Sequence, residues 1–335
     1  MTTGFNWGQM FHYITLQYNK QSELPKPVAD MIRSVAPEAW LENVRFSGTY
    51  SNYMNLDQAG YGQHDNTLPL WAQISNQKQN PLQRIQFTLN VLLKNRAAIF
   101  KSLAPYVSQS YLYNLVATYH QLGCKTMAFT FNSHMPYIKY CKLSESIKSL
   151  EYVHKNTNLV SLELENETYL AGYIVGSKNK KDYEPKINAF LSFLEKEAIP
   201  AITSVIGKNI PLGISIVDER IAKYKYWNNA VMQLRERLIK NGYTVFLVPH
   251  VYTAGYTQKN ITEELDYQIN SKSAPDCRLR ITEFNADSSA GNCSQDEAIN
   301  FIKRFQEVAT ERKNIDAIYY HSLYTQKGAH FSFVK

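Results

Sequence analysis

The sequence lacks any long apolar run, since no window approaches the roughly 18 uninterrupted apolar residues that a membrane-spanning helix requires. It also lacks a recognisable leader, because residues 1–9 contain neither a basic stretch nor an apolar one. We therefore expect no membrane span. The localisation stays open between the cytoplasm and secretion with a leader that has been removed.

Cysteine is scarce as well, with four residues whose spacing matches no metal site. Cys277 and Cys293 could pair, but we expect reduced, partly buried thiols. A Gly-x-Gly-x-x-Gly turn is missing after the first strand-like segment, which removes the main support for a dinucleotide-binding fold. We therefore expect neither a metal nor a cofactor.

The charge balance is basic, at +7 with a pI near 9.0. Such a charge suits a polyanionic partner, yet the lysines are scattered and no helix-turn-helix, zinc-finger or aromatic RNA-binding pattern occurs. We therefore expect no nucleic-acid partner. A carbohydrate that carries carboxylate or sulfate groups explains the charge equally well. The sequence does not indicate an oligomeric state.

The chain does have abundant core material, with 44% hydrophobic and 13% aromatic residues, and its short apolar runs alternate with longer amphipathic ones. The predicted strands are 4–7, 44–47, 126–131, 159–164, 212–217, 244–248, 278–284 and 317–321. The predicted helices are 27–35, 82–103, 106–122, 143–154, 186–206, 221–241, 262–270 and 294–312. Eight strands in this rhythm predict a (β/α)8 TIM barrel.

The barrel is expected to occupy residues 1–335 as a single domain without an accessory module. Residues 50–80, rich in Asn, Gln, Gly and Tyr, form the longest irregular stretch and should make a wall over the site. After the last predicted strand only residues 322–335 follow. This is too short for an eighth helix of ordinary length, so we expect either a barrel that closes without it or a chain that is a fragment or one piece of a larger assembly.

Two glutamates stand at the ends of predicted strands four and seven. Glu167 follows Asn166, and Glu283 lies between Thr282 and Phe284. Hydrolysis of a glycosidic bond needs one carboxyl group to protonate the leaving oxygen and another to meet the oxocarbenium-like centre, about 5–5.5 Å apart in retaining enzymes. Strands four and seven lie on opposite sides of an eight-stranded barrel, so the two carboxylates should face each other across its mouth.

These motifs resemble the large superfamily (clan A) of retaining glycoside hydrolases, in particular its heparanase/β-glucuronidase-like and β-xylosidase/α-iduronidase-like families. In those families strand two carries Arg-Phe-Pro-Gly-Gly-Thr and then an Asn and an aromatic residue, strand four Glu-Leu-Gly-Asn-Glu, and strand six His-x-Tyr. The resemblance covers nearly the whole chain. The matching segments are Arg45-Phe46-Ser47-Gly48-Thr49-Tyr50-Ser51-Asn52-Tyr53, Glu163-Leu164-Glu165-Asn166-Glu167, His250-Val251-Tyr252, Thr282-Glu283-Phe284-Asn285 and Tyr319-Tyr320-His321-Ser322-Leu323.

The resemblance implies a role for each matched residue. Glu167 would be the general acid/base and Glu283 the nucleophile, while Asn166 would hydrogen-bond the sugar hydroxyl beside the reacting carbon. Arg45 and Tyr252 would keep Glu283 ionised and oriented. Glu167 must carry a proton when the reaction begins, and the loss of the charge of Glu283 in the covalent intermediate lets Glu167 change role. The other candidates for substrate binding are His250, His321, Asn132 and Trp7.

Each assignment has a structural alternative. The glutamates and Arg45 could form ion pairs at the rim of the barrel, and the two histidines could be core residues with satisfied hydrogen bonds. Trp7 could pack in the core, which is the commoner place for a tryptophan.

Three departures set this chain apart from the families it resembles. Residues 47–49 lack the proline and one glycine, and Glu165 replaces a glycine beside the catalytic pair. We also expect neither the frequent β-sandwich nor the eighth helix. If Glu165 faces inward, it should raise neighbouring carboxylate pKa values or need an arginine or lysine.

The favoured function is a retaining glycoside hydrolase that acts on a poly- or oligosaccharide. The alternative is a non-catalytic carbohydrate-binding barrel, such as a surface or virion adhesin. A weaker third possibility is a barrel enzyme that cleaves another kind of bond, because a fold does not fix its chemistry.

Overall fold

The computed structural model of the chain describes residues 1–7, 26–46, 109–137, 139, 142–170, 179–217, 219, 222–272, 277–286, 290 and 293–322. The predicted wall at 50–80, the predicted helix 82–103 and the segment after the last strand lie outside these described residues. The missing eighth helix and the single-domain organisation therefore stay predictions.

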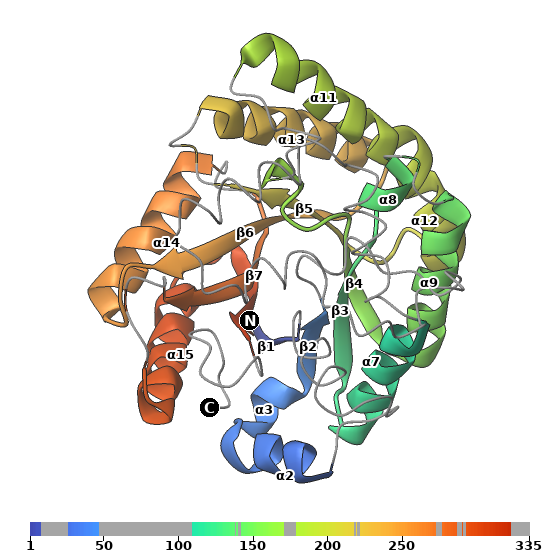
Figure 1. Ribbon diagram of the computed structural model, residues 1–335. Coiled ribbons are helices and arrows are strands. Elements are labelled where there is room, and N and C mark those ends of the chain that lie inside the picture. The colour runs from blue at the N-terminus through green and yellow to red at the C-terminus, as the bar shows by residue number, and fades with distance from the viewer. Residues whose placement is uncertain are drawn as a thin grey trace, which may run out of the picture.

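The centre of the molecule is a closed barrel of eight parallel strands (Figure 1). Each strand pairs with the next one along the chain, and β8 returns to pair with β1. The strands are β1 (Thr2–Asn6), β2 (Asn43–Phe46), β3 (Thr126–Thr130), β4 (Leu159–Glu163), β5 (Leu212–Ile216), β6 (Val245–Thr253), β7 (Leu279–Ala286) and β8 (Ile315–His321). This arrangement confirms the predicted (β/α)8 barrel.

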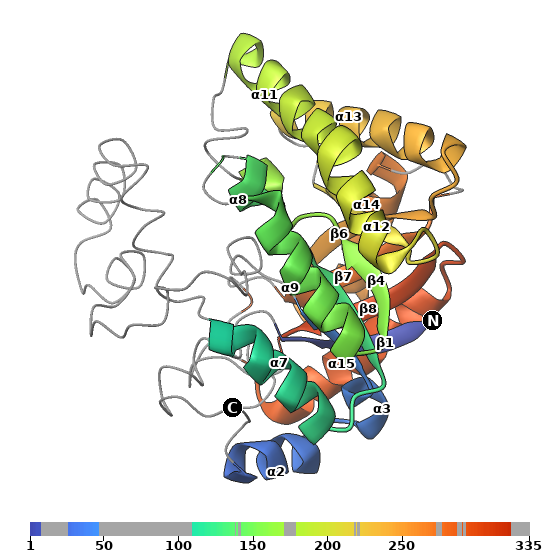
Figure 2. The same ribbon diagram turned by 90° about the vertical axis from the view of Figure 1, so that its right-hand side faces the viewer.

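Helices surround the barrel as an outer ring, and the side view shows them running alongside the strands (Figures 1 and 2). The main helices are α2 (Lys26–Val35), α3 (Glu38–Leu41), α7 (Gln109–Gln121), α8 (His134–Tyr137), α9 (Leu143–Asn156), α11 (Lys180–Phe193), α12 (Ile199–Ile206), α13 (Ala222–Lys240), α14 (Gln258–Lys272) and α15 (Gln295–Thr310). A π-helical turn, η4 (Leu194–Ala198), joins α11 to α12, and a 3-10 turn, η3 (Thr168–Leu170), follows β4.

All eight predicted strands are present, and their bounds shift by a few residues only, except in β6. That strand continues to Thr253, so His250 and Tyr252 belong to the strand itself. The predicted helix 186–206 begins earlier, at Lys180, because the side chain of Asn179 accepts a hydrogen bond from the backbone of Lys181 and caps the first turn. The short elements α3, α8 and η3 are additions that the sequence pattern does not predict.

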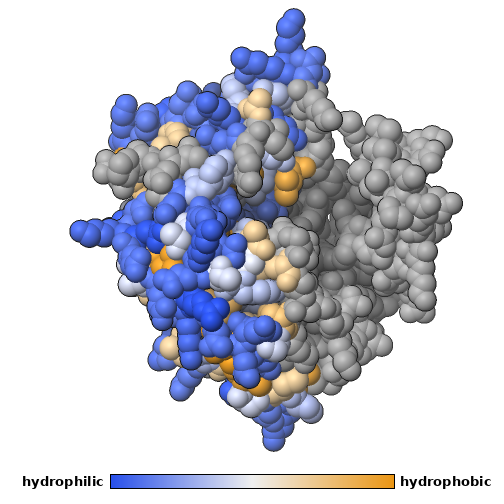
Figure 3. All heavy atoms as spheres, turned by 90° about the vertical axis from the view of Figure 1, so that its left-hand side faces the viewer, coloured by the Kyte–Doolittle hydropathy of each residue, from blue (hydrophilic) through white to orange (hydrophobic). Residues whose placement is uncertain are grey.

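Apolar side chains fill the space between the strands and the helices. Phe284 of β7 stacks on Phe305 of α15 with ring centroids 3.9 Å apart. On β5, a Cβ atom at Gly213 would lie 2.5 Å from the ring of Phe246, so only glycine fits there. The outer face that includes α14 and α15 is mostly hydrophilic, with apolar residues scattered over it (Figure 3). Cys277 and Cys293 are buried and do not pair with each other in the structure, and Cys124 is half-buried.

Candidate active site

The side chains of the candidate site come from the C-terminal ends of the strands and the turns that follow them. Since all eight strands are parallel, these ends meet at one mouth of the barrel. Along each strand alternate residues point to the same side. Neighbouring strands β6 and β7 also place His250 and Glu283 in direct register.

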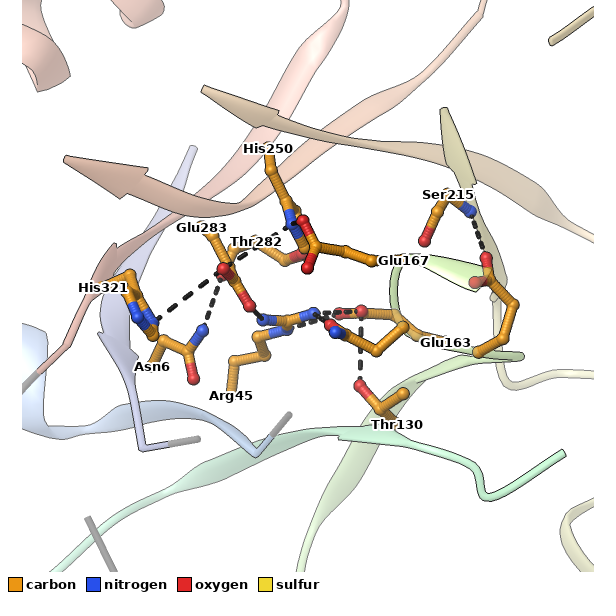
Figure 4. A network of polar contacts seen from close by, with 12 residues as sticks. Asn6, Arg45, Thr130, Glu163, Glu167, Ser215, His250, Thr282, Glu283 and His321 are labelled. Carbon is orange, nitrogen blue, oxygen red and sulfur yellow. Dashed lines mark hydrogen bonds and ion pairs between the residues drawn. The ribbon is translucent and has the colours of Figure 1, made fainter. Parts of the chain in front are cut away.

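Arg45 on β2 lies at the centre of the mouth and is completely buried (Figure 4). Its Nε donates to Glu163 Oε1 at 2.8 Å, and Nη2 donates to the other oxygen of the same carboxylate. Its Nη1 donates to Glu283 Oε1 at 2.7 Å, and Nη2 also reaches Asn166 Oδ1 at 3.1 Å. Burial alone would lower the pKa of Arg45, but the charges of Glu163 and Glu283 outweigh it and raise the pKa. The guanidinium therefore stays charged and joins β2, β4 and β7.

Glu283 on β7 is held from both sides of its carboxylate, and its side chain is only 6% exposed. Arg45 occupies Oε1, while Oε2 accepts a hydrogen bond from the hydroxyl of Tyr252 at 2.8 Å. The imidazole Nδ1 atoms of His250 and His321 lie 3.6 and 4.0 Å from Oε2. Burial would raise the pKa of Glu283, but the positive charges of His250 and Arg45 outweigh it and hold the pKa well below its usual range. Glu283 is therefore a carboxylate at neutral pH.

Glu167 lies beyond the end of β4 and is the more accessible of the two glutamates, with 26% of its side chain exposed. Its Oε1 accepts a hydrogen bond from the hydroxyl of Tyr169 at 3.1 Å and lies 3.0 Å from His250 Nδ1. Its backbone has φ of 49°, in the left-handed region that residues other than glycine adopt only when their surroundings enforce it. Such conformations are concentrated at functional sites.

His250 on β6 lies between the two glutamates, which point toward it from opposite sides (Figure 4). One nitrogen, Nδ1, contacts both carboxylates, while Nε2 lies 3.5 Å from the hydroxyl of Thr282. Burial would lower the pKa of His250, but the charge of Glu283 and the charge and hydrogen bond of Glu167 raise it. His321, also buried, has a lowered pKa because burial outweighs the attraction of Glu283.

The structure thus brings seven of the nine candidate residues into one network. These are Arg45, Asn166, Glu167, His250, Tyr252, Glu283 and His321. Asn132 is buried just after β3. Trp7 is 1% exposed and belongs to the hydrophobic core, so its ring offers no open face to a sugar. The structure therefore gives no support to Trp7 as a stacking platform.

Several residues of the network carried no predicted role. Glu163 forms the buried ion pair with Arg45 and accepts a hydrogen bond from Thr130 at 3.3 Å. A signal for it exists in the sequence, because a carboxylate at an inward position of a parallel strand needs a cation. Tyr169, which donates to Glu167, had no such signal in a chain with 24 tyrosines.

Glu165 lies just beyond the end of β4 and is completely buried. The sequence predicted that an inward-facing Glu165 would raise neighbouring carboxylate pKa values or need an arginine or lysine, and among the described residues neither cation contacts it. Its two oxygens instead accept hydrogen bonds from the backbone N–H groups of Thr168 at 2.8 Å and Ser215 at 2.9 Å.

Over the described ranges, no group of three or more His, Cys, Asp or Glu side chains is arranged to hold a metal ion. Within the same part of the chain, no helix is both long enough and apolar enough to cross a membrane.

No protein-family profile matches the sequence. No curated protein matches it either. Solved structures with a similar fold include a GH128 (subgroup II) endo-β-1,3-glucanase from Sorangium cellulosum, at 16% identity and a TM-score of 0.42, over 64% of this chain and 76% of the other. The tri-modular endo-β-1,4-glucanase B of Bacillus halodurans has 14% identity and a TM-score of 0.46, over 96% and 56%. The β-glucosidase of Pyrococcus furiosus has 9% identity and a TM-score of 0.47, over 96% and 86%. Likeness at this level concerns the course of the backbone and does not bear on activity.

Proposed function

We propose that this chain is a retaining glycoside hydrolase in which Glu167 is the general acid/base and Glu283 the nucleophile. The observation that carries the proposal is the position of His250, whose Nδ1 lies 3.0 Å from Glu167 Oε1 and 3.6 Å from Glu283 Oε2. Because both distances are measured from the same nitrogen, Glu167 Oε1 and Glu283 Oε2 can be no further apart than the sum of the two distances.

The two known mechanisms of glycosidases differ in the separation of the two carboxyl groups. The carboxyl groups lie about 5–5.5 Å apart in retaining enzymes and about 6.5–9.5 Å apart in inverting enzymes, which need room for a water molecule. The two distances together only just reach the lower end of the inverting range, and only if the three atoms lie on a straight line. The geometry therefore favours retention.

In the first step, a carboxylate oxygen of Glu283 attacks the anomeric carbon of the sugar. The bond from this carbon to the glycosidic oxygen breaks, and Glu167 transfers its proton to the departing oxygen. Glu283 is suited to attack because its lowered pKa keeps it ionised. Its Oε2 is the oxygen that lies near His250, which also contacts Glu167.

In the second step, a water molecule attacks the anomeric carbon of the glycosyl ester. Glu167 accepts a proton from this water, the bond to Glu283 breaks, and Glu283 leaves as a carboxylate. Asn166, whose Oδ1 is oriented by Arg45 at 3.1 Å, is placed to bind a sugar hydroxyl beside the reaction centre. The motifs shared with clan A and with its heparanase-like and β-xylosidase-like families support the same roles. We propose a poly- or oligosaccharide as the substrate.

A non-catalytic carbohydrate-binding barrel would be favoured by a pair of glutamates that are both buried and neutralised by arginine. Only Glu283 meets that description, with 6% exposure and a direct contact to Arg45. Glu167 is 26% exposed, and no arginine or lysine among the described residues contacts it. One glutamate is therefore fixed in charge and the other is accessible, which is the division that acid/base catalysis needs.

The test is a screen of aryl glycosides and polysaccharides, followed by incubation with the matching 2-fluoro glycoside and mass spectrometry of the peptides. We expect hydrolysis with retention of anomeric configuration and a glycosyl ester on the peptide that contains Glu283. Inversion of configuration, or an ester on another residue, would contradict the mechanism. Binding without hydrolysis of any sugar would favour the carbohydrate-binding barrel.

A further inference from the structure

Glu165 is a buried carboxylate at the barrel mouth that the proposed reaction does not use. It is 0% exposed, and no lysine, arginine or histidine within the described ranges forms an ion pair with it. A buried charge is costly unless hydrogen bonds compensate it. The groups that compensate this one therefore show what Glu165 holds in place.

Both of its partners are backbone N–H groups. Oε2 accepts from Thr168 at 2.8 Å, and Oε1 accepts from Ser215 of β5 at 2.9 Å. These distances are typical of well-formed N–H···O hydrogen bonds. Thr168 is the first residue of η3, whose initial N–H groups have no acceptor within the turn itself. Glu165 thus caps this turn and fastens it to β5.

Glu167 lies inside the loop that this hydrogen bond closes. The chain runs from Glu165 through Glu167 to Thr168, and the bond from the Thr168 N–H back to the Glu165 carboxylate fixes both ends of the segment. Within it, Glu167 has the left-handed φ of 49°. A non-glycine residue keeps such a backbone conformation only where the surrounding structure enforces it.

Ser215, the second hydrogen-bond donor to Glu165, is also connected to Glu167 through Trp227 and Tyr169. Trp227 of α13 donates its indole N–H to the carbonyl oxygen of Ser215 at 2.9 Å. Its ring meets the edge of the Tyr169 ring at a centroid distance of 6.1 Å and an angle of 68°. Tyr169 in turn donates to Glu167 Oε1. The backbone of Glu167 and its carboxylate are therefore both fixed against β5 and α13.

We infer that Glu165 is a positioning residue for Glu167. Its carboxylate ties the turn that carries Glu167 to β5 and so fixes where the proton of the acid/base is delivered. This inference rests on the proposed function, because it assigns Glu165 through the role of Glu167. A glycine at this position, as in the families that the sequence resembles, could not make either hydrogen bond.

The test uses two conservative variants, Glu165→Gln and Glu165→Asp, with Glu236→Gln as control. Glutamine keeps the shape, but its amide NH2 would face one of the two N–H donors. Aspartate keeps the charge but is too short to reach both donors. Glu236 is an exposed glutamate of α13 and does not belong to the network around the two glutamates. The measurement is kcat/KM, which reports the step that breaks the glycosidic bond, for aryl glycosides with good and poor leaving groups.

We expect kcat/KM to fall about tenfold to a hundredfold on substrates with poor leaving groups, which depend on a well-placed proton. On a dinitrophenyl glycoside, which needs little acid assistance, we expect a change of no more than about twofold. Both variants should melt as single cooperative transitions. An equal loss on all substrates, no loss on any, or a failure of both variants to fold would overturn the inference, because each outcome shows that Glu165 does not act specifically on Glu167.

Amide hydrogen exchange separates this inference from the proposed function. We expect faster exchange at Thr168 and Ser215 in both variants and no change in Glu236→Gln, whether or not the protein hydrolyses any sugar. Unchanged exchange at these two amides would overturn the positioning role of Glu165. A wild-type protein without glycosidase activity, but with faster exchange in the variants, would overturn the proposed function and leave the anchoring of the turn by Glu165 in place.

Discussion

Glu283 and Glu167 lie on opposite sides of His250, in two halves of the barrel mouth that are built differently. On the β2–β7 side, Glu283 is buried against the Arg45 guanidinium, which Glu163 also binds. On the β4–β5 side, the Glu165 carboxylate accepts hydrogen bonds from the backbone N–H groups of Thr168 and Ser215 and so holds the turn that carries Glu167. The hydroxyl of Tyr169 donates to the Glu167 carboxylate. The Arg45 guanidinium fixes one half, neutral donors anchor the turn in the other, and His250 contacts both glutamates.

The difference matches what the two groups must do. A nucleophile has to remain ionised, and a fixed guanidinium secures that state. An acid/base gives up a proton and takes it back in each turnover, and a guanidinium in contact with it would favour only one of its two states. Tyr169 and the anchored turn position Glu167, and among the described residues no arginine or lysine contacts its carboxylate.

The largest expected effect is the loss of activity when Glu283, in the half of the mouth that contains Arg45, is replaced. Glu283→Gln keeps the shape of the side chain but removes the nucleophile, so kcat on an aryl glycoside should fall by on the order of 10⁴-fold or more. The fold should survive, because Arg45 keeps its ion pair with Glu163. Steady-state kinetics and circular dichroism measure the two properties, with Glu236→Gln as control. Retained activity would remove Glu283 from the proposed mechanism.

Disabling the neutral half should have a smaller and more selective effect. Glu167→Ala removes the proton donor, so we expect kcat/KM to fall about 10²–10⁴-fold for poor leaving groups and much less for activated ones. Added azide can attack the glycosyl intermediate without base assistance and should partly restore turnover, giving a glycosyl azide detectable by mass spectrometry. A loss that is independent of the leaving group would mean that Glu167 is not the acid/base.

The next effect concerns Arg45, whose removal should lower the free energy of unfolding. Arg45→Met leaves two buried carboxylates without their guanidinium, so the free energy of unfolding should fall by about 3–5 kcal/mol. Arg237 provides the matched control, because it binds Glu195 with the same two-pronged geometry, at 2.8 and 2.9 Å, but at the surface. Arg237→Met should cost no more than about 1 kcal/mol. Urea denaturation measures both values, and equal losses would contradict the greater importance of the buried ion network for stability.

The smallest effect concerns His250, which contacts both halves. The carboxylates raise its pKa above the usual value of about 6.5. Protonation of His250 therefore adds stability that is complete below about pH 6.5 and is lost as the pH rises through the raised pKa. In Glu283→Gln the main attraction is gone, so the pKa of His250 should fall. NMR titration of its imidazole measures this shift, and an unchanged or higher pKa in the variant would show that Glu283 does not control it.

The fold was largely predictable because each strand is a short β-rich apolar run with an amphipathic helix after it. The end of β6 was missed because Pro249 and His250 interrupt the apolar pattern of that strand. The small elements α3, α8 and η3 were missed because a helix of three or four residues has no periodicity to detect.

The sequence was informative about which residues gather at the mouth and less so about what each one touches. Glutamates at two strand ends can be recognised as a pair, since parallel strands bring their ends together. The partners of Glu165 could not be recognised, because backbone N–H groups have no signature in a sequence. The place of His250 between the two glutamates follows from three-dimensional distances alone. Trp7 lies in the core, which the usual burial of tryptophan already made the commoner case.

The closing of the barrel by β1 and β8 bears on how the protein folds. These strands come from opposite ends of the described chain, and contacts between such distant segments form slowly because a long loop must first be closed. Arg45 on β2 and Glu283 on β7 are not on neighbouring strands, so each keeps its water shell until the sheet curls into a ring. The Arg45–Glu283 ion pair therefore forms only with the closed barrel, and recovery of activity during refolding should follow closure and not the earlier formation of helices.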